Sequence, residues 1–205
     1  MGISNKVIKL LNVWSEDLFS SFSISEIMKL SGKKTKTWVF NSLKLLKKDY
    51  LIISQRKGNM DLYSLNVNNN LVFHLLHYLE VQKNINFPEL ELINQTINEI
   101  PVKDYCLIVF GSYAENKQVK TSDLDMCFLV ENELVAKKIK PYFNEIKLNH
   151  KVRVDEHYIT FNDFKEMLLR NEENLGKQIV KNHKIFYNPD IYYKLLKEAH
   201  KHGFS

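Results

Sequence analysis

This sequence of 205 residues is poor in cysteine and lacks several longer signals. Its two cysteines, Cys106 and Cys127, are too few for a disulfide framework or a zinc site, so we expect two buried thiols in a reducing compartment. No apolar run approaches the ~20 residues of a membrane-spanning helix, and the first residues lack the apolar core of a signal peptide. We also find no internal repeats and no low-complexity segments. These absences favour a cytoplasmic protein without a membrane partner.

The composition is that of a chain that folds around a core, since 44% of the residues are hydrophobic and 12% are aromatic. The net charge of +5 is unevenly distributed. Residues 1–66 hold 11 Lys and Arg against 5 Asp and Glu, a net charge of +6, whereas residues 67–205 hold 18 against 19. This asymmetry predicts an anionic partner for the first third, most often nucleic acid. The alternative is a solvated lysine-rich surface.

The first third has the pattern of three helices followed by a hairpin. An amphipathic helix is expected over residues 3–14. Ser23–Glu26 is a capping box that starts a second helix, which Gly32 ends, and a third helix runs from about Thr35. Two short strand-like runs then flank a hairpin tip at residues 55–61.

Residues 1–66 resemble the winged-helix DNA-binding domains of small prokaryotic regulators, and the resemblance places the third helix in the major groove of DNA. Such proteins are often dimers, so a homodimer is expected. Lysines mostly contact phosphates, which give affinity but little sequence information. The alternative is a module for protein docking or dimerisation. The predicted DNA-binding residues, on the third helix and the wing, are Lys33, Lys34, Lys36, Thr37, Lys44, Arg56 and Lys57.

The rest of the chain divides into a helical linker over residues 67–100 and a C-terminal domain over residues 101–205. The boundary of the linker is a polar break at Val67–Asn70. In the C-terminal domain a helix is expected over residues 133–146, with a kink or break at Pro141. Strand-like runs occur at residues 105–110, 124–130 and 152–159.

Gly111 and Ser112 follow directly on a buried strand, where glycine lets backbone N–H groups approach a phosphate and serine adds a donor. Asp123 and Asp125 open the next strand, and their spacing puts both carboxylates on one face, roughly 6–7 Å apart. Two like charges there are destabilising unless a cation binds between them. Hard divalent ions such as Mg²⁺ take oxygen ligands together with substrate phosphates. The stretch therefore predicts metal-assisted phosphate chemistry.

A third carboxylate from the strand at 152–159 would complete the cluster. Asp155 and Glu156 are both available, but they point to opposite faces. Glu156 shares its face with Val152, Val154 and Tyr158. Because this is the more apolar set, it is the natural core face, which leaves Asp155 to the cleft.

Gly111-Ser112, the Asp123-Leu124-Asp125 pair and the later strand acid together resemble the nucleotidyltransferase superfamily of DNA polymerase beta. The pattern is most similar to the minimal nucleotidyltransferases of prokaryotes and covers roughly residues 100–200. The implied fold class is α+β, a mixed-sheet core with helices, preceded here by the winged helix-turn-helix domain.

The resemblance implies Mg²⁺-dependent transfer of a nucleoside monophosphate, AMP from ATP or another nucleoside triphosphate, to an acceptor hydroxyl. Gly111 and Ser112 would hold the triphosphate. Asp123 and Asp125 would bind two metal ions, and Asp155 would bind the catalytic one and help to activate the acceptor. Ser122 either assists the nucleotide or caps its turn.

Glu115 departs from the family, whose members often carry an arginine there, and an acid does not help to hold a triphosphate. Small members paired with HEPN-domain toxins act as antitoxins that add AMP to the partner. A HEPN-type protein, through a tyrosine or serine hydroxyl, is therefore the expected acceptor. The alternatives are a DNA-binding regulator whose nucleotidyltransferase domain is a nucleotide sensor or inactive scaffold, and a transferase acting on RNA or antibiotics.

Overall fold

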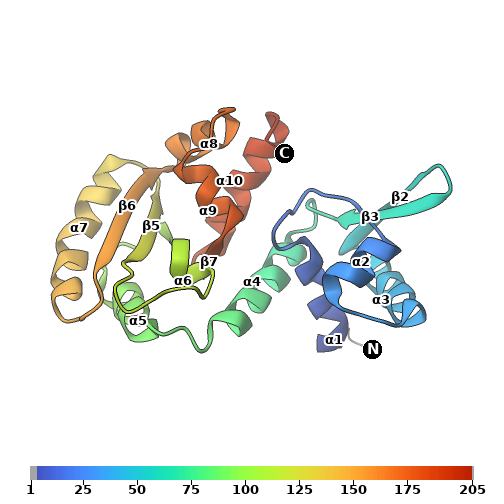
Figure 1. Ribbon diagram of the computed structural model, residues 1–205. Helices are drawn as coiled ribbons and strands as arrows, with labels where there is room; N and C mark the ends of the chain where they lie inside the picture. The colour runs from blue at the N-terminus through green and yellow to red at the C-terminus, as the bar shows by residue number, and fades with distance from the viewer. Residues whose placement is uncertain (1–3, 205) are drawn as a thin grey trace. The chain divides into compact units, whose positions relative to one another are not determined.

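The computed structural model describes residues 4–204 (Figure 1). Contacts divide the chain into two units, Met1–Leu79 and Glu80–Ser205. The division falls inside helix α4 (Asn70–Asn84), within the stretch expected to be a linker. The linker region consists of α4 and α5 (Leu90–Glu99), and α5 packs into the core of the second unit.

The first unit contains short helices and a three-stranded antiparallel sheet in the order β1-β3-β2. The helix expected over residues 3–14 is divided into a short α-helix and a 3₁₀ helix, and residue 3 lies outside the described residues. The elements are α1 (Asn5–Ile8), the 3₁₀ helix η1 (Lys9–Trp14), β1 (Phe22–Ser23), α2 (Ile24–Ser31), α3 (Lys36–Lys48), β2 (Ile52–Lys57) and β3 (Met60–Leu65).

Local signals set the ends of α2 as expected. The Ser23 hydroxyl accepts from the Glu26 N–H, and the Glu26 carboxylate accepts from the Ser23 N–H at 2.8 Å, which is a capping box. Gly32 ends the helix with a φ of +65°, a conformation that glycine adopts at no steric cost.

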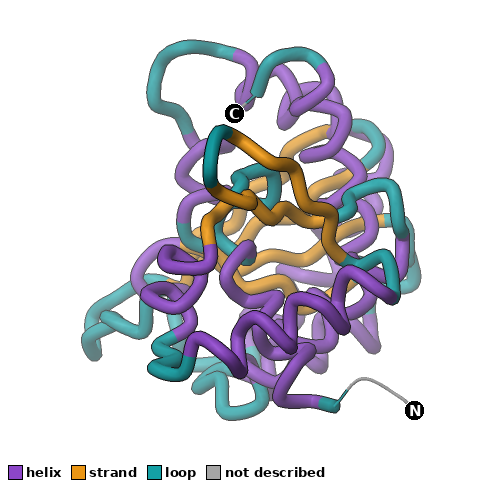
Figure 2. Tube along the Cα trace, turned by 90° about the vertical axis from the view of Figure 1, so that its right-hand side faces the viewer, coloured by secondary structure: helices purple, strands orange, loops and turns teal. Residues whose placement is uncertain are grey.

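The hairpin of β2 and β3 is also as expected (Figure 2, orange strands nearest the viewer). Arg56 pairs with Asp61 and Lys57 with Met60, so Gly58 and Asn59 form the turn. From residue 4 onward, the first unit thus has the helical elements α1, η1, α2 and α3, a turn between α2 and α3, and a hairpin.

The second unit is built on a mixed four-stranded sheet in the order β6-β5-β4-β7, which agrees with the expected α+β class. The central strand β4 is antiparallel to β5 and β7, and β5 is parallel to β6. The elements after α5 are β4 (Tyr105–Phe110), α6 (Gly111–Ala114), β5 (Leu124–Val130), α7 (Glu133–Leu148), β6 (Val154–Thr160), α8 (Phe161–Leu169), α9 (Leu175–Lys181), β7 (His183–Tyr187) and α10 (Pro189–Lys201).

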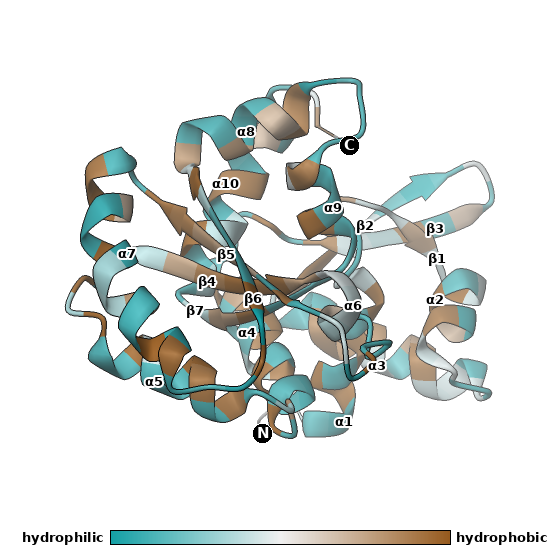
Figure 3. Ribbon diagram, turned by 60° about the vertical axis from the view of Figure 1, so that its left-hand side comes forward, coloured by the Kyte–Doolittle hydropathy of each residue, from teal (hydrophilic) through white to brown (hydrophobic). Residues whose placement is uncertain are grey.

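Every residue of β4 is buried and β5 is nearly so, as their apolar sequences predict (Figure 3, brown segments). One face of the sheet packs against α5 and α7 through residues such as Leu107, Val109 and Phe128. Because side chains alternate, Cys106 and Cys127 point to the other face, which α8 and α10 contact. Both cysteines are free and buried.

Helix α7 runs unbroken through Pro141, so the expected break does not occur. Its buried face includes Ala136, Ile139, Phe143 and Ile146, and packing of this face against the sheet outweighs the local preference of proline.

None of the helices within residues 4–204 has both the length and the apolar character that crossing a membrane requires.

Candidate active site

The parallel pairing of β5 and β6 brings two predicted carboxylates together. Asp125 is the register partner of Asp155, and Met126 is the partner of Glu156. Neighbouring residues in register lie on the same face of a sheet, so Asp155 is the acid beside Asp125. Glu156 points to the other face, where its carboxylate forms an ion pair with Lys147 of α7.

Gly111 brings the backbone against this pair. It follows β4 immediately, opens α6 and has a φ of +65°. A Cβ on Gly111 would lie 2.1 Å from Oδ2 of Asp125, closer than any side chain allows. The main chain and the Asp125 carboxylate therefore touch only because residue 111 is glycine.

The surroundings of Asp125 disfavour its negative charge. Burial raises the pKa of the Asp125 carboxyl above its ordinary value, and the carboxylate of Asp155 raises it further. His157 acts in the opposite direction. Its Nε2 lies 3.4 Å from Oδ2 of Asp155, and its ring contacts Phe110 with centroids 5.5 Å apart. A cation beside Asp125 and Asp155 would relieve their repulsion.

Asp123 is engaged differently from the other two acids. Its Oδ1 lies 3.3 Å from Nε of Arg153, yet this oxygen is shielded from solvent and accepts no hydrogen bond from the described residues. The contact is thus an ion pair without hydrogen-bond geometry. Across residues 4–204, no three His, Cys, Asp or Glu side chains are already arranged to hold a metal ion. Asp123 contacts Arg153, while Asp125 and Asp155 are neighbours on one face of the sheet.

The donor set nevertheless fits a hard divalent cation. Three carboxylates come from one strand end and its neighbour, and carboxylate oxygens are the ligands that Mg²⁺ prefers. One of their oxygens, Oδ1 of Asp123, is shielded and lacks a hydrogen bond. Burial and the neighbouring carboxylate of Asp155 raise the pKa of Asp125, and a bound cation would favour its charged form.

The segment between Gly111 and Asp123 contains the other predicted residues. Ser112 is half-buried in the first turn of α6, where the leading N–H groups of a helix have no partner within it. The Ser122 hydroxyl accepts from the Val119 N–H at 2.9 Å, so this side chain closes its turn. Glu115 forms an ion pair with Lys117 at 2.7 Å, which partly neutralises the acid that departs from the family pattern.

Arg153 is the residue of this site that sequence reasoning did not assign. Arg153 is two residues from Asp155, so strand alternation gives both the same face, but no local pattern connects Arg153 to Asp123. The pairing depends on the parallel register of β5 and β6, through which the Leu124 N–H also donates to the Arg153 carbonyl at 2.8 Å.

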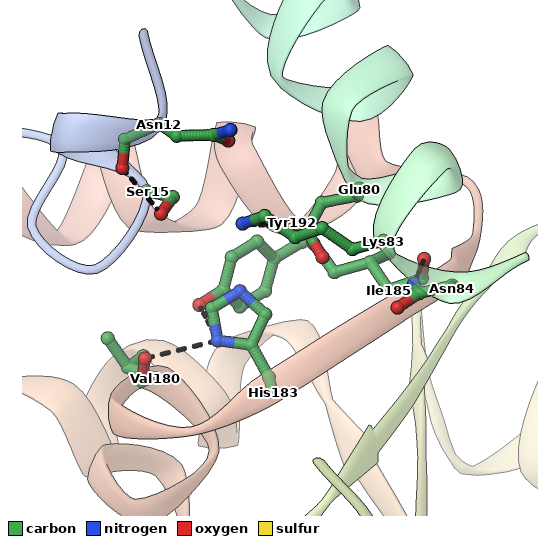
Figure 4. A network of polar contacts seen from close by, with 9 residues as sticks. All are labelled: Asn12, Ser15, Glu80, Lys83, Asn84, Val180, His183, Ile185 and Tyr192. Carbon is green, nitrogen blue, oxygen red and sulfur yellow. Dashed lines mark hydrogen bonds and ion pairs between the residues drawn. The ribbon is translucent and has the colours of Figure 1, made fainter. Parts of the chain in front are cut away.

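A separate group of polar contacts holds β7 (Figure 4). Nδ1 of His183 lies 3.1 Å from the Val180 carbonyl oxygen and 3.4 Å from the Tyr192 hydroxyl. The Asn84 amide donates to the Ile185 carbonyl at 3.3 Å. These contacts tie β7 to the end of α4 and to α10, and we regard them as structural.

The predicted DNA-binding residues all lie on the surface of the first unit. On the hairpin, Arg56 and Lys57 are exposed. The ammonium group of Lys33 sits over the Trp38 ring at 5.3 Å, and that of Lys44 over the Phe40 ring at 4.5 Å. The predicted DNA-binding residues of the turn before α3 and of α3 itself are likewise exposed, namely Lys33, Lys34, Lys36, Thr37 and Lys44.

Comparison with known proteins supports the class of the second unit. Residues 91–192 match the family described as Polymerase beta, Nucleotidyltransferase. The match spans 102 of the 205 residues and supports the assignment of the second unit to this nucleotidyltransferase superfamily.

A solved structure described as "Crystal structure of the toxin-antitoxin with AMP-PNP" is similar at 14% identity, covering 55% of this chain and 86% of that one. Its TM-score of 0.36 is too low to establish a shared fold. No curated protein is a significant match.

Proposed function

We propose that this chain is a Mg²⁺-dependent nucleotidyltransferase that transfers AMP from ATP to an acceptor hydroxyl, with loss of the hydroxyl proton and release of pyrophosphate. The observation that carries the proposal is the placement of Asp125 beside Asp155, with the backbone of Gly111 against the Asp125 carboxylate. The family match over residues 91–192 supports the reaction class.

Asp123, Asp125 and Asp155 would hold the metal ions, two in number. When bound, Mg²⁺ would neutralise phosphate charge and favour deprotonation of the acceptor hydroxyl. Asp125 is central because it lies between the other two acids, being two residues from Asp123 and in register with Asp155. Asp123 must exchange its contact with Arg153 for one with a metal ion.

The chain's own residues would position the triphosphate at the start of α6. The left-handed conformation of Gly111 turns the chain away from β4, and the N–H groups of the first helical turn, which have no partner within α6, would bind phosphate oxygens. Ser112 would add its hydroxyl. Lys117 offsets the charge of Glu115, which reduces the repulsion of an incoming triphosphate.

The acceptor in this proposal is a tyrosine or serine hydroxyl of a partner protein of the HEPN type. This choice rests on the resemblance of the Gly-Ser and Asp-x-Asp pattern to antitoxins that add AMP to such partners. Asp155 borders this position from the edge strand β6 and would orient the hydroxyl.

Incubation of the protein with α-labelled ATP, MgCl₂ and a HEPN-type protein tests this function. We expect label on the acceptor with the wild-type chain, and only background with Asp123→Ala and Asp125→Ala. Glu156→Gln is the matched control, because this acid pairs with Lys147 on the other face and its variant should keep transfer. Transfer that survives both alanine changes would contradict the mechanism.

DNA binding by the first unit, as a homodimer, is a second candidate function. The supporting observation is that α3 contains no acidic residue and exposes Lys36, Lys44 and Lys48. Binding to duplex DNA, measured by fluorescence anisotropy over a range of salt concentrations, should weaken steeply with salt. Changing Lys33, Lys34 and Lys36 together to alanine should reduce that salt dependence; an unchanged dependence would rule out this candidate.

A further inference from the structure

Helix α3 presents one outward stripe of polar side chains. Thr37, Asn41, Lys44 and Lys48 are spaced by four, three and four residues, which places them on one face of a helix. All four are exposed. The opposite face is buried through Val39, Ser42, Leu43 and Leu46. Packing against the rest of the unit therefore fixes which side of α3 meets a partner.

The charge around this stripe suits a polyanion. No Asp or Glu occurs in α3, and the turn before it contributes Lys33 and Lys34. The whole of residues 1–66 has a net charge of +6. A phosphate backbone complements such a surface.

Two of the lysines are restrained by aromatic rings. Lys33 lies over Trp38 and Lys44 over Phe40, at 5.3 and 4.5 Å from the ring centroids. A cation–π contact limits the conformations of a long side chain. These two ammonium groups come from the turn before α3 and from its second half, and their positions bracket Asn41 along the chain.

Asn41 differs chemically from the lysines around it. Its amide offers one acceptor and two donors, whereas an ammonium group offers donors alone. Asn41 makes no side-chain hydrogen bond within the described part of the chain, so the amide is free for a ligand. Asparagine pairs in a bidentate way with N7 and the N6 amino group of adenine in the major groove.

We propose that Asn41 reads an adenine edge in the major groove of DNA, while Lys33 and Lys44 hold the flanking phosphates. Thr37, one turn earlier on the same face, contacts the neighbouring base pair. The inference rests on the proposed DNA binding of the first unit. It adds a division of labour in which sequence preference comes from Asn41 and affinity from the lysines.

Selection from a random duplex library with the full-length protein, followed by anisotropy on the selected site, tests the inference. The wild-type protein should select a site with an adenine at one fixed position. Asn41→Ala should weaken binding to that site by about 5- to 150-fold and remove the preference at that base pair, with the salt dependence unchanged. Lys44→Ala should weaken binding to all sequences alike and lower the salt slope by about one.

Asn98→Ala, an exposed asparagine on α5 in the second unit, is the matched control and should leave both quantities unchanged. Circular dichroism and thermal unfolding should show Asn41→Ala folded like the wild type, since the side chain is exposed.

The inference is overturned if Asn41→Ala keeps the wild-type base preference, or if the wild type binds DNA without any preference. If the wild-type protein does not bind DNA at all, both this inference and the proposed DNA binding of the first unit are overturned. None of these results bears on nucleotidyl transfer, which is measured separately.

Discussion

The two units of this chain use charge in opposite ways. In the second unit, Asp125 and Asp155 are held side by side by the register of two strands, and the backbone of Gly111 closes on one of them. In the first unit, the lysines of α3 and its preceding turn extend from an exposed surface. Because the main chain fixes the positions of these acids, no other side chain can take the place of one that is removed. Exposed lysines each add a small, salt-screened contribution to binding.

The largest expected effect comes from Asp125→Asn. Transfer should fall to background because the central ligand of the acid group is removed. Stability should not fall with it. Burial and Asp155 raise the pKa of Asp125, so the folded state disfavours its charge near neutral pH, and removing that charge should keep or raise Tm.

Thermal unfolding with and without MgCl₂ checks this separation. Magnesium should raise the Tm of the wild type more than that of Asp125→Asn, because a ligand stabilises the state that binds it. A large drop in Tm of the variant without magnesium would mean that the Asp125 carboxylate stabilises the fold. It would then not be held at this position only to bind metal, as the comparison of the two units supposes.

Gly111→Ala should have the next largest effect. The new Cβ would meet Oδ2 of Asp125, and alanine is strained at a φ of +65°. We expect a loss of stability of about 1–3 kcal/mol. Transfer should drop by on the order of 100-fold, because displacing a catalytic group by about 1 Å has effects of this size.

Gly58→Ala is the control for Gly111→Ala. Gly58 has nearly the same φ, +61°, but no atom lies within 4 Å of its added Cβ. Backbone strain should lower its stability, while transfer stays at the wild-type level. Equal losses of transfer in both variants would show that strain alone, and not the contact with Asp125, is responsible. Measurement requires chemical unfolding and initial rates for both proteins.

The same distinction explains what the sequence could predict. The hairpin at Gly58, the capping box at Ser23 and the buried strands β4 and β5 follow from local patterns, and the structure confirms them. Of the kink or break expected at Pro141, the break does not occur, because packing of α7 against the sheet outweighs the local preference of proline. Local sequence patterns predict where a helix or strand starts, whereas packing against distant residues determines whether it continues.

In the active site, strand alternation put Asp155 and Glu156 on opposite faces of β6, and the more apolar set beside Glu156 favoured Asp155 as the acid of the cleft. What the sequence did not show is the parallel register with β5, which places Asp155 beside Asp125 and leaves Glu156 on the face of Lys147. The contact between Arg153 and Asp123 could not be predicted either, because the two residues directly precede β6 and β5 and meet only through that same register. The acids could be identified from the sequence, whereas the contacts that each of them makes depend on the register of β5 and β6.

A smaller effect is expected from single lysines of the first unit. Lys36→Ala should weaken DNA binding a few-fold at low salt, and the slope of log affinity against log salt should decrease by about 0.9 for each phosphate that the variant no longer neutralises. Anisotropy titrations at four salt concentrations measure the slope, with Lys6→Ala, an exposed lysine of α1, as the comparison. If one alanine change abolished binding, the first unit would depend on a single group as the second does.

The smallest expected effect belongs to Arg153→Gln. Its contact with Asp123 joins side chains that are 85% and 40% exposed, and ion pairs of this kind contribute little to stability. Tm should therefore change by no more than a degree or two. The change should instead appear in the Mg²⁺ concentration that transfer requires, because Asp123 no longer has to leave the guanidinium group of Arg153 before it binds Mg²⁺. A magnesium titration of transfer at fixed ATP should show half-maximal activity at a lower concentration, within about fivefold of the wild type. If the variant needed more magnesium, Arg153 would be orienting Asp123 for the metal. Activity would then depend on this exposed ion pair, as it does on the contact between Asp125 and Gly111.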